Sequence, residues 1–173
     1  MSESRSFRAK IDYLMDAPKH LTGETSWVKT SYTGQYRWLA PLNIDGELTP
    51  MNLIIDSYPR LDILTFHVII QCVTCVSRLD YSEAERHNNH KVKGVRTPAG
   101  VEMGWIFGPH YHRWEDNRML NNAATPPKEL EFAVRLPVEF RGFDSAFRWF
   151  CGDAKIVIAA NQMPSLPLRD TLL

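Results

Sequence analysis

The chain has 173 residues, of which 44% are hydrophobic and 23% charged, and its 20 acidic side chains balance its 20 basic ones. This composition excludes a chain that is disordered throughout, and the zero net charge excludes a strongly cationic DNA-binding protein. The length suits a single domain spanning residues 1–173. Within it, we expect residues 1–20 to form an N-terminal extension or helix and residues 161–173 a loosely attached tail.

The first part of the chain predicts one helix followed by strands. Apolar residues at helical spacing indicate a short helix over residues 6–16. Residues 27–28 can begin a strand, and residues 35–42 have strong strand propensity. The sequence Asn-Ile-Asp-Gly at 43–46 predicts a hairpin turn, with a return strand over 48–58.

The middle of the chain predicts further strands around a polar connection. Residues 63–79 give the strongest strand pattern, and both of its faces are apolar, so we expect a central strand covered on both sides. Residues 80–100 form a long polar connection, a feature that is often functional or mobile. Residues 101–107 predict another strand, and residues 110–118 can continue as one.

The last part predicts helices. Residues 128–135 read as a short helix, and residues 143–150 as a better one, with Asp144 as its N-cap and Gly152 at its end. Residues 156–158 form either a last strand or more helix.

The pattern as a whole predicts an α+β fold. We expect a mainly antiparallel sheet of about five to six strands. A short N-terminal helix and one or two C-terminal helices would pack on this sheet.

The three cysteines argue against a disulfide framework, because their number is odd. Cys72 and Cys75 form a lone C-x-x-C inside the predicted strand, where residues three apart point to opposite faces, so we expect buried thiols rather than a zinc or redox site. The N-terminus lacks the apolar run of a signal peptide, and no segment is long and apolar enough to span a membrane. We therefore expect a cytoplasmic protein.

Four of the six histidines lie between positions 87 and 112. His110 and His112 are two apart, so on a strand they share a face, which Trp114 and Asp116 would continue. Two adjacent imidazoles can act as acid and base near neutral pH. They can also offer two nitrogens to a metal, or they can be polar residues of an exposed strand. A metal would need a further ligand, for which the candidates are His87, His90, Asp80 and Asp116.

Two other segments carry candidate residues. Arg78-Leu-Asp80-Tyr81 lies where the strongest strand ends, and Arg78 could bind a phosphate or form a structural pair with Asp80. Residues 86–93 are the most cationic stretch and resemble a phosphate-contacting loop, or a solvated one. Among the five tryptophans, Trp114 is the candidate for base stacking, because it would share the histidine face.

The order of these features resembles that of the TumE-like toxin components found in prokaryotic toxin–antitoxin and mobile-element neighbourhoods. The similarity spans roughly residues 35–158 and rests on Arg78–Tyr81, His87-Asn88, the Gly-Pro-His110-Tyr-His112 stretch and the helix that opens at Phe143. Those proteins also place an H-x-H pair in a late strand before a terminal helix. The resemblance implies an RNA-directed toxin or related defence protein, with His110 and His112 as the matching polar pair.

We therefore expect a phosphodiester-directed enzyme that uses His110 and His112 as acid and base. We expect no metal or other cofactor, because carboxylates do not cluster as a two-metal site requires. The substrate would be RNA or another phosphate-containing ligand. The substrate-binding residues would be Arg78, His87, Arg113 and Trp114.

Two alternatives stay open at this point. One is a non-enzymatic module, such as an antitoxin or inhibitor, that binds a cognate protein through an exposed sheet face carrying Tyr111 and Trp114. The other is a metal-dependent small-molecule enzyme. No membrane contact is expected in any of these cases.

Overall fold

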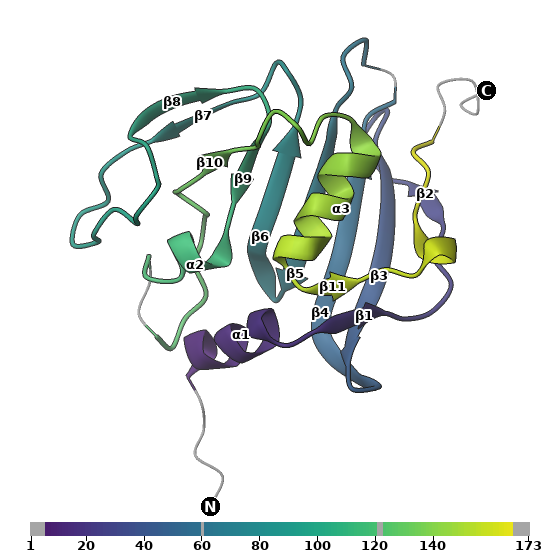
Figure 1. The fold of residues 1–173 in the computed structure, drawn as a ribbon, viewed down its shortest axis with the longest axis horizontal. Coiled ribbons are helices and arrows are strands. Elements are labelled where there is room, and N and C mark those ends of the chain that lie inside the picture. Colours follow the sequence, from purple (N-terminus) through teal and green to yellow (C-terminus); the bar gives the residue numbers. More distant parts are fainter. Residues whose placement is uncertain (1–5, 60, 121–122, 168–173) are drawn as a thin grey trace, which may run out of the picture.

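The computed structural model describes residues 6–59, 61–120 and 123–167. The fold is α+β, with a nine-stranded mixed sheet and a separate two-stranded sheet (Figure 1). The predicted five to six strands are too few, because several short strands extend the sheet at both edges. The strands are β1 (Lys19–Leu21), β2 (Trp27–Lys29), β3 (Tyr36–Ile44), β4 (Glu47–Ser57), β5 (Phe66–Cys72), β6 (Thr74–Tyr81), β7 (Arg86–Asn89), β8 (Gly104–Phe107), β9 (His110–His112), β10 (Val134–Arg135) and β11 (Ile156–Val157).

The helices are α1 (Phe7–Asp16), α2 (Trp114–Asn117) and α3 (Phe143–Asp153), with a 3-10 turn at Ala160–Gln162. None of the helices within the described residues has both the length and the apolar character needed to cross a bilayer. The large sheet runs in the order β10-β9-β6-β5-β4-β3-β1-β11, and β2 pairs with β3. It is antiparallel except where β1 pairs with β11 in parallel.

The β3–β4 hairpin forms as predicted. Its strands are joined by Asp45 and Gly46, whose φ angles are 52° and 83°. Two successive residues with positive φ are what a two-residue type I′ turn requires, and Asp-Gly tolerates both. Pro50 lies at the register shift of the β3–β4 pairing, beyond the stretch that pairs with β5, so its missing N–H leaves no ladder bond unmade.

The predicted single strand over 63–79 is wrong, because the chain reverses at Val73. Val73 has a φ of 65° and separates β5 from β6, with Cys72 and Thr74 paired across it. A β-branched residue rarely adopts positive φ, so the local sequence carries no turn signal there. The pairing of β5 with β4 on one side and β6 on the other fixes the reversal.

The polar connection after β6 contains β7, which pairs with β8 to form the two-stranded sheet. The predicted strand over 110–118 ends at His112, because α2 follows at once. Arg113 precedes this short helix and donates from its Nε to Asp116 Oδ2 at 2.7 Å. Trp114, in the helix, donates from its Nε1 to Asp12 Oδ1 of α1 at 2.8 Å. Contacts with α1, distant in sequence, therefore favour the helix.

The predicted helix over 128–135 is also wrong, because this segment is extended and ends in β10. Its backbone is held by two asparagine side chains that act as a neighbouring strand would. Asn117 bonds to the N–H and carbonyl of Phe132 at 2.9 and 2.8 Å. Asn89 bonds to the N–H and carbonyl of Ala133 at 2.8 Å each.

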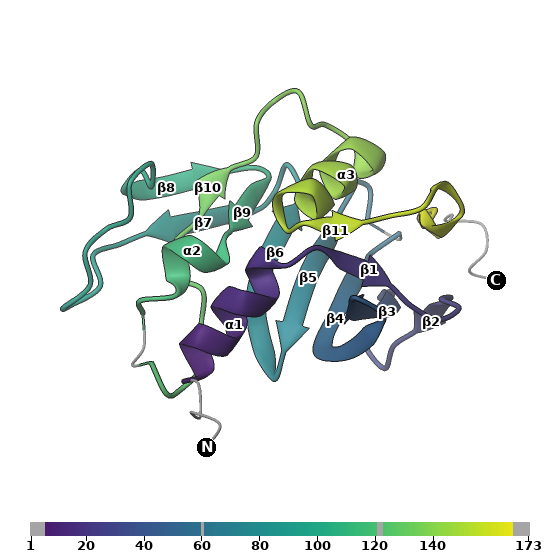
Figure 2. The same cartoon turned by 60° about the horizontal axis from the view of Figure 1, so that its bottom comes forward.

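One face of the large sheet forms the core with α3 (Figure 2). The helix begins at Phe143, one residue before the predicted N-cap, and runs past Gly152 to Asp153. Phe147 and Phe150 are fully buried against the sheet. The opposite face of β5, β6 and β9 carries mostly polar side chains, with Ile69 among them.

The first and the last of the described segments pack beside the sheet. The predicted N-terminal helix is present, and Ser6 Oγ caps it by accepting from Ala9 N at 3.3 Å. The predicted tail makes contacts as far as Leu166: Met163 and Leu166 pack on the core, and Trp27 Nε1 donates to Ser165 O at 2.7 Å. Residues 168–173 lie outside the described residues.

Lys19 should be essential for stability. Its fully buried ammonium donates to the carbonyls of Leu14, Met15 and Ala17 at 2.8, 2.9 and 2.8 Å. These bonds satisfy carbonyls at the C-terminal end of α1. Replacing Lys19 with Met leaves these acceptors without a donor, so urea unfolding should show a loss of about 2–4 kcal/mol. The exposed Lys10 is the control: Lys10→Met should change stability by less than about 0.5 kcal/mol.

Candidate functional site

A row of polar residues crosses the sheet on the face opposite α3. The strand register makes them successive cross-strand neighbours from β3 to β10, and residues directly opposite one another on a sheet point to the same face. The row consists of Arg37, Asp56, His67, Asp80, His110 and Arg135. A second cross-strand pair on this face, Arg78 and His112, lies two residues along the strands.

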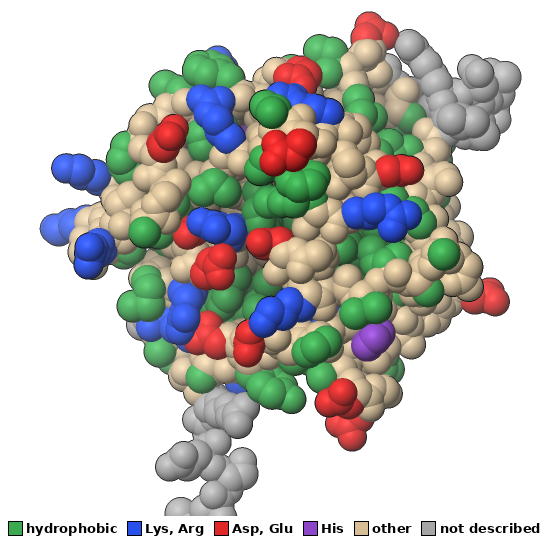
Figure 3. Space-filling model, in the orientation of Figure 1, with side chains coloured by type: hydrophobic (Ala, Val, Ile, Leu, Met, Phe, Trp, Pro, Cys, Tyr) green, Lys and Arg blue, Asp and Glu red, His purple; other side chains and the backbone are tan. Residues whose placement is uncertain are grey.

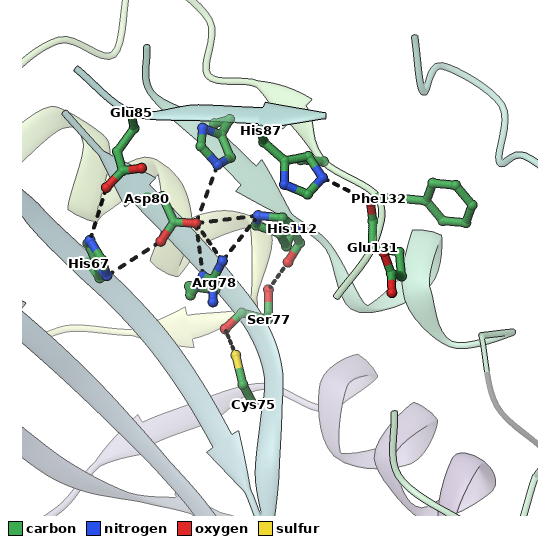
Figure 4. A network of polar contacts seen from close by, with 12 residues as sticks. His67, Cys75, Ser77, Arg78, Asp80, Glu85, His87, His112, Glu131 and Phe132 are labelled. Atoms are coloured by element: carbon green, nitrogen blue, oxygen red, sulfur yellow. Dashed lines mark hydrogen bonds and ion pairs between the residues drawn. The ribbon is translucent and has the colours of Figure 1, made fainter. Parts of the chain in front are cut away.

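Asp80 is the centre of this face (Figure 4). Its Oδ2 accepts from Arg78 Nη2 at 2.8 Å and from Arg78 Nε at 2.9 Å. The Nε2 atoms of His110 and His112 lie 3.4 and 3.3 Å from the same oxygen, and His67 Nδ1 lies 3.5 Å from Oδ1. Asp80, His110 and His112 are each less than 5% exposed.

His87 reaches this group from the two-stranded sheet. Its ring centroid lies 4.7 Å from that of His112 and 5.6 Å from that of His110. Asn89, on the same face of β7 as His87, bonds to Ala133 just before β10, and the Nε2 contact of His87 to Glu131 O positions its ring. We call Arg78, Asp80, His87, His110 and His112 the Asp80 cluster.

Backbone carbonyls fix the tautomers of two of the histidines. His110 Nδ1 lies 2.9 Å from Gly108 O, and His87 Nε2 lies 2.9 Å from Glu131 O. A carbonyl only accepts, so these nitrogens carry a proton. His87 Nδ1 then holds the lone pair of a neutral ring, whereas His110 Nε2 donates to Asp80 Oδ2 when the His110 ring is protonated. His112 Nε2 lies 3.5 Å from Arg78 Nη2, and its buried Nδ1 has no hydrogen-bond partner.

The pKa values of the titratable groups in the Asp80 cluster are shifted in different directions. Burial opposes the charge on Asp80, but the bonds from His110 and His112 and the charge of Arg78 outweigh it and hold the pKa of Asp80 well below its usual value. Burial also opposes the charge on His110, yet Asp80 and the Gly108 carbonyl raise the pKa of His110. Burial lowers the pKa of His112 to about 4 and lowers that of His87.

A metal ion could also be held by this arrangement. One ring nitrogen from each of His87, His110 and His112 lies within 4.8 Å of the others. Metal-bound histidines usually donate their outer N–H to a carbonyl, as His87 and His110 do. Arg78 opposes a cation, however, because its guanidinium already contacts Asp80 Oδ2 and His112 Nε2, two of the atoms nearest the centre.

The structure brings four of the six predicted site residues together, namely Arg78, His87, His110 and His112. Arg113 and Trp114 lie elsewhere, because the chain enters α2 directly after β9 and the alternation of a strand stops. They line a separate cavity of about 500 Å³ between α1 and α2, rimmed by acidic and basic side chains (Figure 3). Trp114 is 5% exposed, so it offers no stacking surface.

The sequence carries a partial signal for Asp80 and for the residues beside the cluster. Asp80 stood out beside Arg78, and its central role follows from its place between β5 and β9. His67 and Glu85 were missed: His67 Nε2 lies 3.8 Å from Glu85 Oε1. His67 and Gln71 share one face of the otherwise apolar strand β5, and these two polar residues are the available signal.

The surface expected for a protein-binding module is not present. Tyr111 and Trp114 are 1% and 5% exposed, and Tyr111 packs on Trp149 and Phe150 of α3. Tyr111 Oη donates to Asp153 Oδ2 at 2.9 Å, which fixes it inside the core face. A partner would have to use another surface.

All three cysteines have free thiols, of which Cys72 and Cys151 are buried and Cys75 is partly buried. Burial raises the pKa of Cys75 to about 11 and also raises the pKa of Cys72 and Cys151. A protonated thiol is a weak nucleophile, so none of the three is activated.

Comparison with protein-family models, with curated proteins and with solved structures gives no match. The resemblance to the TumE-like toxin components stays a prediction. The chemistry of the Asp80 cluster therefore carries the functional argument.

Acid should weaken the fold through His112. Its pKa is lower in the folded protein than the ordinary 6.5, so the unfolded chain binds the proton first. The stability contributed by neutral His112 is present above pH 6.5 and is lost as the pH falls toward 4. Urea unfolding at pH 7 and pH 5 should show a smaller loss for His112→Gln than for the wild type. Equal losses would contradict this role.

Proposed function

We propose that this protein is a metal-independent, RNA-cleaving enzyme of the toxin or defence type, with the Asp80 cluster as its reaction centre. One observation carries the proposal. Around a single buried carboxylate, the pKa of His110 is raised, whereas the pKa values of His87 and His112 are lowered. Neighbouring groups whose pKa values are separated in this way are suited to act as acid and base.

We assign the catalytic roles according to exposure. His87 is half-buried and neutral, so it is the base, and His110 is the acid that Asp80 keeps protonated. His112 is fully buried and serves as a positioning residue instead of the base expected from the H-x-H pattern. The side chain of Arg78 is 38% exposed and binds the phosphate.

Binding of the phosphate also makes His110 accessible to the substrate. His110 is only 2% exposed, and Arg78 is bonded to the carboxylate beside it. When Arg78 exchanges its bond to Asp80 for a bond to the phosphate, His110 Nε2 can reach the leaving oxygen. Catalytic hydrogen bonds often form only in the substrate complex.

The choice of RNA rests on the nucleophile. The three thiols have raised pKa values, so no cysteine is activated for attack. RNA supplies its own nucleophile in the ribose 2′-hydroxyl. His87 takes the proton of this hydroxyl, and the oxygen attacks phosphorus. The P–O5′ bond breaks, and the leaving oxygen takes a proton from His110. The products are a 2′,3′-cyclic phosphate and a 5′-hydroxyl.

The test is cleavage of an RNA oligonucleotide beside the same sequence with 2′-deoxyribose. We expect cyclic-phosphate products from RNA and no cleavage of DNA. His87→Asn and His110→Asn should each lower the rate by about 100-fold or more. The exposed His20 is the control, and His20→Asn should cleave at the wild-type rate. The rate should rise with pH through the pKa of His87 and fall through that of His110. Full activity in both cluster variants would remove the proposal.

A metal centre is the second candidate, favoured by the convergence of three ring nitrogens. The positive charge of Arg78 predicts that the purified wild-type protein retains less than one equivalent of zinc after dialysis. We also expect EDTA to leave RNA cleavage unchanged. One equivalent of bound zinc, together with loss of cleavage in EDTA, would replace the acid–base proposal with a metal-dependent one.

A further inference from the structure

The outer face of the β7–β8 sheet carries two exposed aromatic rings. Trp105 and Phe107 are 55% and 63% exposed, and their rings are inclined by 28°, with centroids 6.4 Å apart. Arg86 pairs with Phe107 across the strands, and its guanidinium lies 5.9 Å from the centroid of the Trp105 ring. Asn88, paired with Trp105, completes this face. We call these four residues the aromatic platform.

The chain around the platform is cationic, although the protein as a whole is neutral. Residues 86–103 contain four lysine and arginine residues and one acidic residue, Glu102. Lys91, Lys93 and Arg96 are exposed in the connection between β7 and β8. Lys and Arg side chains project from the edge of the molecule where this connection lies (Figure 3; compare Figure 1).

We infer that the aromatic platform binds unpaired bases of a single-stranded nucleic acid. Exposed aromatic rings beside a positively charged surface are the features that single-strand binding uses, because every base can stack on a ring and every phosphate carries a negative charge. Trp105 and Phe107 can each stack one base, and Arg86 can contact a phosphate or cover a base. Binding of a protein to the aromatic rings would not explain why the connection between β7 and β8 is cationic.

The platform is coupled to the Asp80 cluster through a single strand. In β7, Arg86 and Asn88 face outward, whereas His87 between them faces the cluster, because successive side chains of a strand alternate. A nucleic acid stacked on the platform lies on the outer face of β7, and it must pass around the edge of the two-stranded sheet to reach His87 on the inner face. This inference rests on the proposed function for its biological meaning, and it names the substrate as unpaired RNA.

The test measures binding of a labelled 2′-deoxy oligothymidine by fluorescence anisotropy. This probe lacks the 2′-hydroxyl, so it reports binding without cleavage. Trp105→Ala and Phe107→Ala should each raise Kd by about tenfold. Lys91→Glu with Lys93→Glu should weaken binding and reduce its dependence on salt. The control is Tyr32→Ala, which removes an aromatic side chain that is 73% exposed outside the platform and should leave Kd unchanged.

Three outcomes would overturn the inference. The first is unchanged affinity for oligothymidine in both aromatic variants, and the second is an affinity for a DNA duplex equal to that for oligothymidine. The third is self-association of the protein through this face, seen by sedimentation at concentrations where no oligothymidine binds. Failure of the proposed function is distinguishable from these results. It would appear as normal, platform-dependent oligothymidine binding without any RNA cleavage.

Discussion

The buried negative charge of Asp80 is the interaction on which the polar face of this protein depends. A carboxylate removed from water is costly unless cations and hydrogen bonds compensate it. Arg78, His110 and His112 supply that compensation at one oxygen, and His67 faces the other. The same contacts that make the burial tolerable also separate the pKa values of the surrounding histidines, so stability and chemistry share one origin.

The sheet keeps this charged group apart from the hydrophobic core. Successive residues of β6 and β9 alternate, so Leu79 and Tyr111 enter the core beneath α3 while Asp80 and His110 point to the opposite face. A sheet with one apolar and one polar face can therefore hold a dense core and a titratable site within the thickness of one layer.

The two-stranded sheet completes the Asp80 cluster and carries the aromatic platform. Its inner face places His87 against His112, and its outer face displays Trp105 and Phe107 to solvent. Asn89 and Asn117 hold the segment that leads into β10 by bonding to the backbone of Ala133 and Phe132. These bonds support the two-stranded sheet without a continuous strand beside it. Catalysis and nucleic-acid binding would then be coupled by the alternation of β7.

The sequence alone determined the elements whose signals are local. The existence of the first helix, of the helix that opens at Phe143 and of the Asp45-Gly46 hairpin follows from apolar spacing and turn chemistry, whereas the predicted Asp144 cap and the extension of the H-x-H strand to residue 118 do not hold. Tertiary structure decided the rest, because the deciding contacts join residues far apart in the chain. The reversal at Val73 depends on strand pairing, and the helix at Trp114 is held by Asp12. The approach of His87 to His112 depends on strand β7, where the sequence predicts only a polar connection. The alternation of side chains along one strand does not reveal which residues of another strand face them.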